Sequence, residues 1–186
     1  MPALKNDYYY TIEDIKNLPE GQRAELIDGQ IYMMTAPKTN HFRVSHALEK
    51  ALDDHITENN LPCEMIHAPF GVWLFDDESV YLEPDILVVC DTNEIDEDGC
   101  KGAPDFVIEI LSTSTRDYDL TTKRDLYFEA GVREYWCVDT ENREVIKYVW
   151  KRFRFPEAGK KVYSFDEDIP VSICQGFAIN LGEMGL

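Results

Sequence analysis

Two acidic residues lie beside or inside runs of aliphatic residues that are typical of buried β-strands. Asp85 directly precedes the run 86–89, and Glu109 lies within the run 106–111. A carboxylate on a buried strand is costly unless a cation or hydrogen bonds compensate for its lost hydration. We therefore expect the fold to bring both acids to a compensating partner, which limits how these strands can be arranged.

If the two runs pair, the alternation of side chains allows both carboxylates to converge at one end of a sheet. A Mg²⁺ ion needs about six oxygen ligands at about 2.1 Å, and protein groups often supply only a few of them. Asp85, Glu109 and the backbone carbonyl of Ile110 would provide such a set. The pattern thus predicts a site for Mg²⁺ or Mn²⁺. A simpler alternative is that Asp85 only begins or caps its strand.

Lys123 lies in a helix expected at about 119–130, where Leu120, Lys123 and Tyr127 share one face. An ammonium group near the two acids could orient or deprotonate an attacking water and offset charge on a phosphate. Alternatively, Lys123 could pair only with Asp119 four residues earlier, or extend along the helix surface. We expect Tyr127 to pack or to donate a supporting hydrogen bond. His41 has no second histidine three or four residues later, so it is not expected to bind zinc, and a supporting role at the mouth of the site stays open.

Local patterns predict a single α/β domain that spans residues 1–186. Thr11 is expected to cap a short helix, and Asp28-Gly29 supplies the positive φ angles of a tight hairpin turn. Gly131 is expected to end the helix that contains Lys123. Helices are expected at about 11–15, 41–59 and 119–130, strands at about 25–32 (a hairpin), 63–75, 81–90, 106–111, 134–139 and 144–150, a polar surface loop at 91–102, and an aromatic, β-rich tail.

The charge of the chain argues against tight non-specific binding to nucleic acid, which normally needs a basic surface. The formal net charge is −18, from 18 basic and 36 acidic residues. This balance does not exclude a nuclease, because a metal site is itself built from carboxylates. Basic residues could also cluster locally, and the candidates are Lys147, Lys151, Arg152, Arg154, Lys160 and Lys161.

Cysteine usage and hydropathy indicate the cellular setting. The five cysteines, which are Cys63, Cys90, Cys100, Cys137 and Cys174, are odd in number and form no C-x-x-C pair, which favours reduced thiols. No apolar run approaches the length of a membrane span, and the first residues lack the apolar region of a signal peptide. We expect a soluble, cytoplasmic protein with no membrane partner.

The ordered set of motifs resembles a known group of nucleases. Pro84-Asp85 followed by Glu109-Ile110-Leu111 is similar to the motif of the PD-(D/E)XK nuclease superfamily, except that Leu111 stands at the superfamily's lysine position. The closer resemblance is to the putative restriction endonuclease family, long catalogued as a domain of unknown function. It covers roughly residues 10–150 and is carried by Glu25-Leu26-Ile27-Asp28-Gly29, His41, Pro84-Asp85, Ala103-Pro104-Asp105, Glu109-Ile110-Leu111-Ser112, Thr115, Asp119, Lys123, Tyr127 and Gly131-Val132-Arg133-Glu134-Tyr135-Trp136.

This resemblance implies a restriction-endonuclease-like core, with a mixed β-sheet flanked by helices, and metal-dependent hydrolysis of phosphodiester bonds in DNA. It implies that Lys123 takes the role that Leu111 cannot, and that Glu25 is a further acidic member of the site. Glu25 could instead be an ordinary ion-pair partner across two strands. By analogy with superfamily nucleases, the resemblance also implies a homodimer.

Two other functions remain open from the sequence. One is a catalytically inactive interaction module that keeps the nuclease scaffold, which the acidic net charge favours and the intact acid–acid–lysine set opposes. The other is a phosphodiesterase that acts on RNA or small nucleotides, which would suit an acidic surface better than long duplex DNA. Plasmid nicking and substrate competition distinguish these from an endonuclease.

Overall fold

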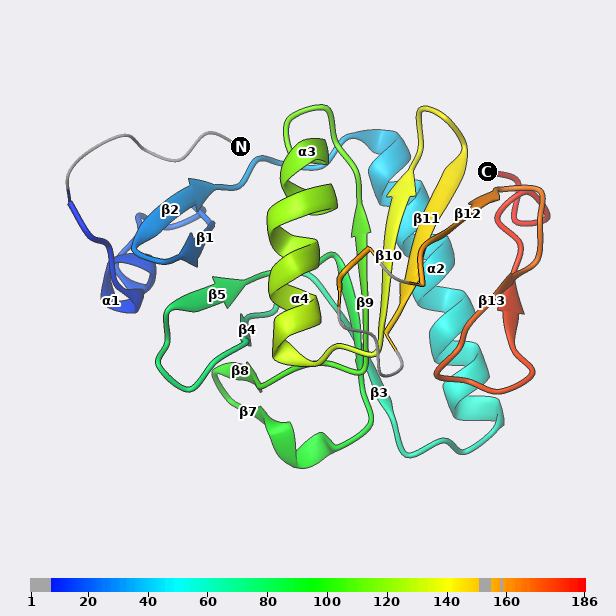
Figure 1. Ribbon diagram of the computed structural model, residues 1–186, viewed down its shortest axis with the longest axis horizontal. Coiled ribbons are helices and arrows are strands. Elements are labelled where there is room, and N and C mark those ends of the chain that lie inside the picture. Colours follow the sequence, from blue (N-terminus) through cyan, green and yellow to red (C-terminus); the bar gives the residue numbers. More distant parts are fainter. Residues whose placement is uncertain (1–7, 151–154, 158) are drawn as a thin grey trace.

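The computed structural model describes residues 8–150, 155–157 and 159–186, and it contains two six-stranded mixed sheets flanked by helices (Figure 1). In the sheet that carries the two acidic strands, only β9 and β10 are parallel and the other neighbours are antiparallel. Its strand order is β12 (Lys161–Ser164), β11 (Glu144–Val149), β10 (Glu134–Asp139), β9 (Phe106–Ile110), β6 (Ile86–Val89) and β3 (Glu64–His67).

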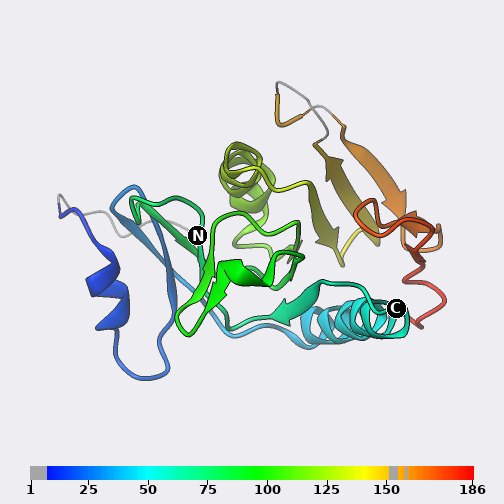
Figure 2. The same cartoon turned by 90° about the horizontal axis from the view of Figure 1, so that it is seen from below.

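Helices cover both faces of this sheet (Figures 1 and 2). Helix α2 (Thr39–Glu58) buries Val44, Leu48, Leu52 and Ile56, which recur every four residues and form its apolar stripe. The other face is covered by a continuous helical segment made of α3 (Arg116–Tyr118), the π-helical turn η2 (Asp119–Lys123) and α4 (Arg124–Ala130). None of the helices in the described part of the chain combines the length and apolar character needed to cross a bilayer.

The second sheet has the order β2 (Gln30–Met33), β1 (Ala24–Ile27), β5 (Val80–Leu82), β4 (Val72–Trp73), β8 (Gly99–Lys101) and β7 (Ile95–Asp96). Strands β1 and β2 form the predicted hairpin, with Asp28 and Gly29 at φ angles of 46° and 76°. Any side chain at Gly29 would also meet the ring of Tyr9, since a Cβ there would lie 2.3 Å from it. The remaining elements are α1 (Ile12–Lys16), η1 (Thr92–Glu94), β13 (Ile169–Pro170) and β14 (Ala178–Ile179).

The predicted fold class is confirmed, and most elements lie where the patterns predicted them. The capping box of Thr11 and Asp14 begins α1, and Gly131 ends α4 in the left-handed conformation. The predicted strand at 63–75 is divided near Pro69, and the predicted strand at 81–90 is divided near Pro84. Proline lacks the N–H that would continue the hydrogen bonds between strands. The predicted loop at 91–102 is wrong in part, since it forms η1 and the β7–β8 hairpin, and β8 pairs with the distant β4.

The prediction of reduced thiols is wrong for two of the five cysteines. Cys63 and Cys90 form a disulfide, whereas Cys100, Cys137 and Cys174 are free and buried. The pairing of β3 with β6 explains the bond, because Glu64 lies opposite Val89 and the next residue outward on each strand is a cysteine. The two residues are 27 positions apart in the chain, so the sequence alone gave no indication of this register.

Candidate active site

The pairing of β6 with β9 brings the two predicted acids together. Ile86 lies opposite Ile108, so the same antiparallel register sets Asp85, just before β6, opposite Glu109. Residues opposite each other in an antiparallel pair project from the same face of the sheet. For Glu109 this is the face covered by α4, whose segment carries Lys123.

Lys123 lies at the centre of the acidic groups. Its Nζ is 2.9 Å from Oε1 of Glu109 and 2.7 Å from Oε1 of Glu25, and all three side chains are buried. Glu25 comes from β1 in the second sheet, and its Oε1 also accepts a hydrogen bond from the backbone N–H of Glu83 at 3.1 Å. The ion pairs therefore join the two sheets through one ammonium group.

Asp85 forms the more open side of the cluster. Its Oδ2 accepts a hydrogen bond from the backbone N–H of Ile110 at 2.7 Å and lies 3.1 Å from Nε2 of His41. The side chains of Asp85 and His41 are 18% and 20% exposed, so solvent reaches the site here. His41 belongs to the first turn of α2, and a supporting role at the mouth of the site was one possibility that the sequence left open for it. Both of these contacts use Oδ2 and neither uses Oδ1 of Asp85.

Two further side chains complete the cluster. The hydroxyl of Tyr127 donates to Oε1 of Glu109 at 2.9 Å, as a supporting residue would. Asp119 is the first residue of the π-helical turn, and its Oδ1 lies 3.7 Å from Nζ of Lys123 without a hydrogen-bond donor. The sequence analysis named Asp119 as part of the family resemblance and as a possible partner of Lys123, but not as a site residue. Its spacing of four residues before Lys123 was the available signal that it belongs to the cluster.

Burial and the neighbouring charges together raise the pKa values of Glu109, Asp119 and Lys123. Burial raises the pKa of Glu109 well above its usual range. The charge of Lys123 lowers this pKa, but the neighbouring acids raise it again. Burial likewise raises the pKa of Asp119 to about 6. Burial lowers the pKa of Lys123, but Glu109, Glu25 and Asp119 raise it by more, so it stays above its ordinary value. The amine is therefore protonated at neutral pH.

The donor set fits a hard divalent cation. Four carboxylates, from Glu25, Asp85, Glu109 and Asp119, face one ammonium and one imidazole, and one buried carboxylate oxygen lacks a donor. Oxygen ligands and excess negative charge are what Mg²⁺ and Mn²⁺ prefer. In the part of the chain that the structure describes, no three or more His, Cys, Asp or Glu side chains form a ready-made metal cage. The predicted set needs only two side chains and a backbone carbonyl, with water completing the shell.

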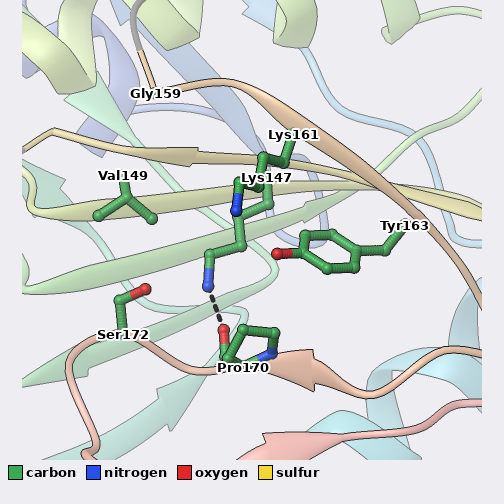
Figure 3. Close-up of a pocket in the computed structure, with 7 residues that line it drawn as sticks. All are labelled: Lys147, Val149, Gly159, Lys161, Tyr163, Pro170 and Ser172. Atoms are coloured by element: carbon green, nitrogen blue, oxygen red, sulfur yellow. Dashed lines mark hydrogen bonds between the residues drawn. The ribbon is translucent and has the colours of Figure 1, made fainter.

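A separate cavity of about 360 Å³ lies between β11, β12 and the C-terminal segment (Figure 3). Its buried lysine, Lys147, pairs with Glu134 at 2.8 Å and donates to the carbonyl of Pro170, so its charge is already compensated. Lys147 therefore does not extend a basic surface, and Lys151, Arg152 and Arg154 lie outside the described residues. The cavity is lined by Lys147, Val149, Gly159, Lys161, Tyr163, Pro170 and Ser172, none of which belongs to the acidic cluster.

Comparisons with known proteins show the family and the fold of this chain. The sequence model of the Uma2 family, described as a putative restriction endonuclease, matches residues 7–172. An uncharacterized protein of Synechocystis sp., slr1290, is 28% identical over 148 residues, which cover 79% of this chain and 74% of that protein. The crystal structure of a putative nuclease belonging to DUF820 from Anabaena variabilis matches with a TM-score of 0.74 and 20% identity, and the match covers 94% of this chain and 96% of that one. At that identity the likeness shows a shared fold.

Proposed function

Since this chain belongs to the Uma2 family of putative restriction endonucleases, we propose that it is a hydrolase that cleaves phosphodiester bonds in DNA with the help of Mg²⁺ or Mn²⁺. The observation that carries the proposal is the meeting of Lys123 with Glu109 and Glu25 beside Asp85. These groups come from two sheets and a helix, and an ordinary structural ion pair would not require a surplus of buried acids.

In this proposal, Asp85, Glu109 and the carbonyl of Ile110 hold the cation. The contacts of Asp85 with His41 and Ile110 use Oδ2, and Glu109 receives both of its donors on Oε1. We therefore assign Oδ1 of Asp85 and Oε2 of Glu109 as the side-chain ligands. When bound, the cation would offset the charge that develops on the phosphate and make a coordinated water more acidic.

Lys123 would orient the attacking water by donating a hydrogen bond to it. Because its amine is protonated, it acts as a donor and as positive charge near the phosphate, and not as a base. Glu25 holds the amine from the other sheet, and Tyr127 fixes the carboxylate of Glu109. His41 fixes Asp85 at the open side of the site. Attack of the water oxygen on phosphorus, in line with the leaving oxygen, would form one P–O bond and break the other, and the proton lost by the water would be balanced by the proton that the leaving oxygen gains from solvent.

Plasmid nicking tests the proposal directly. Purified protein is expected to nick supercoiled DNA with Mg²⁺ or Mn²⁺, and a chelator is expected to abolish the reaction. Asp85→Ala and Lys123→Ala should each lower the rate by about 100-fold or more, since each removes a group that acts on the reacting atoms. Glu109→Gln keeps the shape of the side chain and should give a similar loss even if Lys123→Ala folds poorly.

Asp139→Asn is the matched control, because Asp139 is another buried acid of the same sheet that makes none of the contacts of the cluster. Nicking that survives both Asp85→Ala and Lys123→Ala would come from a contaminant or another site. A complete lack of nicking under all metal conditions would favour the inactive interaction module. We also propose, by analogy with superfamily nucleases, that the active form is a homodimer, which sedimentation equilibrium would test.

A further inference from the structure

A long segment next to the acidic cluster contains no acidic residue. Residues 29–48 contain no Asp or Glu, although the chain has 36 acidic residues among 186. The same segment contributes Lys38 and Arg43, which are exposed at the beginning of α2. A phosphate group approaching the protein would therefore meet positive charge here, next to the opening of the site at Asp85.

The same surface exposes a large aromatic ring. The side chain of Phe42 is 65% exposed, and its ring lies parallel to that of His46 with 6.3 Å between the ring centres. Phe42 follows His41 directly, and Nε2 of His41 is 3.1 Å from Asp85. The exposed ring is thus adjacent in the helix to a residue that contacts the proposed metal ligand. Burial of Val44 and Leu48 fixes the helix so that this exposed face cannot turn inward.

An exposed ring beside two cations is the combination that recognises an unpaired base and its phosphates. Bases stack on aromatic side chains when they are not already stacked in a duplex, and basic side chains hold the flanking phosphates. A long duplex would bring many phosphates close to a protein with a net charge of −18. A short single strand that lies only on this patch avoids most of that repulsion.

We propose that the beginning of α2 binds single-stranded DNA, with one base stacked on Phe42 and adjacent phosphates held by Lys38 and Arg43. This inference rests on the proposed nuclease function and specifies its substrate. The strand would run from this patch toward Asp85, so that the next phosphate reaches the acidic cluster. Base stacking would then hold the substrate in place while the cluster acts on the backbone.

Fluorescence anisotropy with a labelled DNA oligonucleotide tests the proposal. Binding is measured in Ca²⁺ buffer, with gels that verify that the oligonucleotide stays intact, for a single strand, its duplex and the RNA of the same sequence. Wild-type protein should bind the single-stranded DNA most tightly. Phe42→Ala should weaken that binding by about tenfold or more, since it removes a stacked base. Arg43→Ala should weaken binding and reduce the slope of log K against log salt by about 0.7.

Tyr8→Ala is the matched control, because Tyr8 is 59% exposed and no Lys or Arg lies within two positions of it in the sequence. It should bind single-stranded DNA like the wild type. Equal affinities of wild type and Phe42→Ala, an equal loss in Tyr8→Ala, or tighter binding of duplex or RNA would overturn the inference. If such a result accompanied metal-dependent nicking that Asp85→Ala abolishes, the nuclease function would stand and only this surface would be wrong.

Discussion

Asp119 and Asp139 are both buried, at 2% and 1% exposure, but they differ in how well their carboxylates are compensated. Oδ1 of Asp119 has no hydrogen-bond donor and lies 3.7 Å from an amine that two other acids already contact more closely. Keeping this carboxylate ionised therefore costs folding free energy. We predict that Asp119→Asn makes the protein more stable at pH 7, by about 1–3 kcal/mol, as measured by urea unfolding.

The pH dependence follows from the direction of the shift. Burial raises the pKa of Asp119 from 3.8 to about 6, so the folded state holds this proton more tightly than the unfolded state does. The contribution of Asp119 to the stability of the wild type is thus lost as the pH rises from about 3.8 to about 6, and Asp119→Asn lacks this loss. The advantage of the variant should shrink when unfolding is repeated at pH 5. A variant that is less stable than wild type at pH 7 would show that Asp119 is better compensated than its contacts indicate.

The sequence could predict those site residues whose environment is set by their immediate neighbours. Asp85 and Glu109 were recognisable because aliphatic residues surround them, and Lys123 because it follows on the next helix. Glu25 came only from the family resemblance, since β1 belongs to another sheet. The four-residue spacing of Asp119 and Lys123 indicated that these two side chains could pair, but the π-helical turn that contains both was not predicted.

Among the elements, the turn between β10 and β11 depends on Asp139. This carboxylate accepts hydrogen bonds from the backbone N–H groups of Glu141 and Asn142, from the Asn142 side chain at 2.7 Å, and from Arg116. We predict that Asp139→Asn destabilises the protein by about 1–3 kcal/mol, because the amide is neutral and brings donors where acceptors are needed. This change in stability has the opposite sign to that of Asp119→Asn. Urea unfolding of both variants at pH 7 makes the comparison.

Burial raises the pKa of Asp139, but hydrogen bonds from Asn142 and Arg116 lower it by more, so the net pKa lies below its usual value. The ionised carboxylate of Asp139 therefore stabilises the folded protein fully above the pKa that Asp139 has in the unfolded state. This stabilisation is lost as the pH falls through the lower pKa that Asp139 has in the folded state. The difference in the free energy of unfolding between wild type and Asp139→Asn should become smaller at low pH. A difference that is constant with pH would mean that the turn depends on shape and not on the charge of Asp139.

Elements stabilised by local contacts were predictable, and those that depend on distant partners were not. The four-residue spacing in α2 and the Asp28-Gly29 turn are complete within a few residues. In contrast, the region 91–102 is polar, and its strands exist because β8 pairs with β4, whose residues precede it by more than 20 positions. The disulfide between Cys63 and Cys90 depends in the same way on the register of β3 with β6.

For the whole molecule, charge is the dominant property, since a net charge of −18 makes the folded chain repel itself. Any salt reduces this repulsion by screening, whereas a cation bound at Asp85 and Glu109 adds stability through its binding free energy. We predict that Mg²⁺ or Mn²⁺ raises the melting temperature more than NaCl at the same ionic strength. At a cation concentration 100 times the dissociation constant, the gain in the free energy of unfolding is about 2.7 kcal/mol. Each kcal/mol raises the melting temperature of a chain of this size by about 2–4 °C.

The variants separate specific binding from screening. Asp85→Asn and Glu109→Gln each remove one negative charge and one proposed ligand, so their melting temperatures should respond to Mg²⁺ only as they respond to NaCl. Asp139→Asn removes the same charge from another buried position and should keep the specific response. A chelator should return the wild type to its metal-free value. If Mg²⁺ and matched NaCl stabilise the wild type equally, the surplus of acids acts only through the overall charge, and the proposed metal site is wrong.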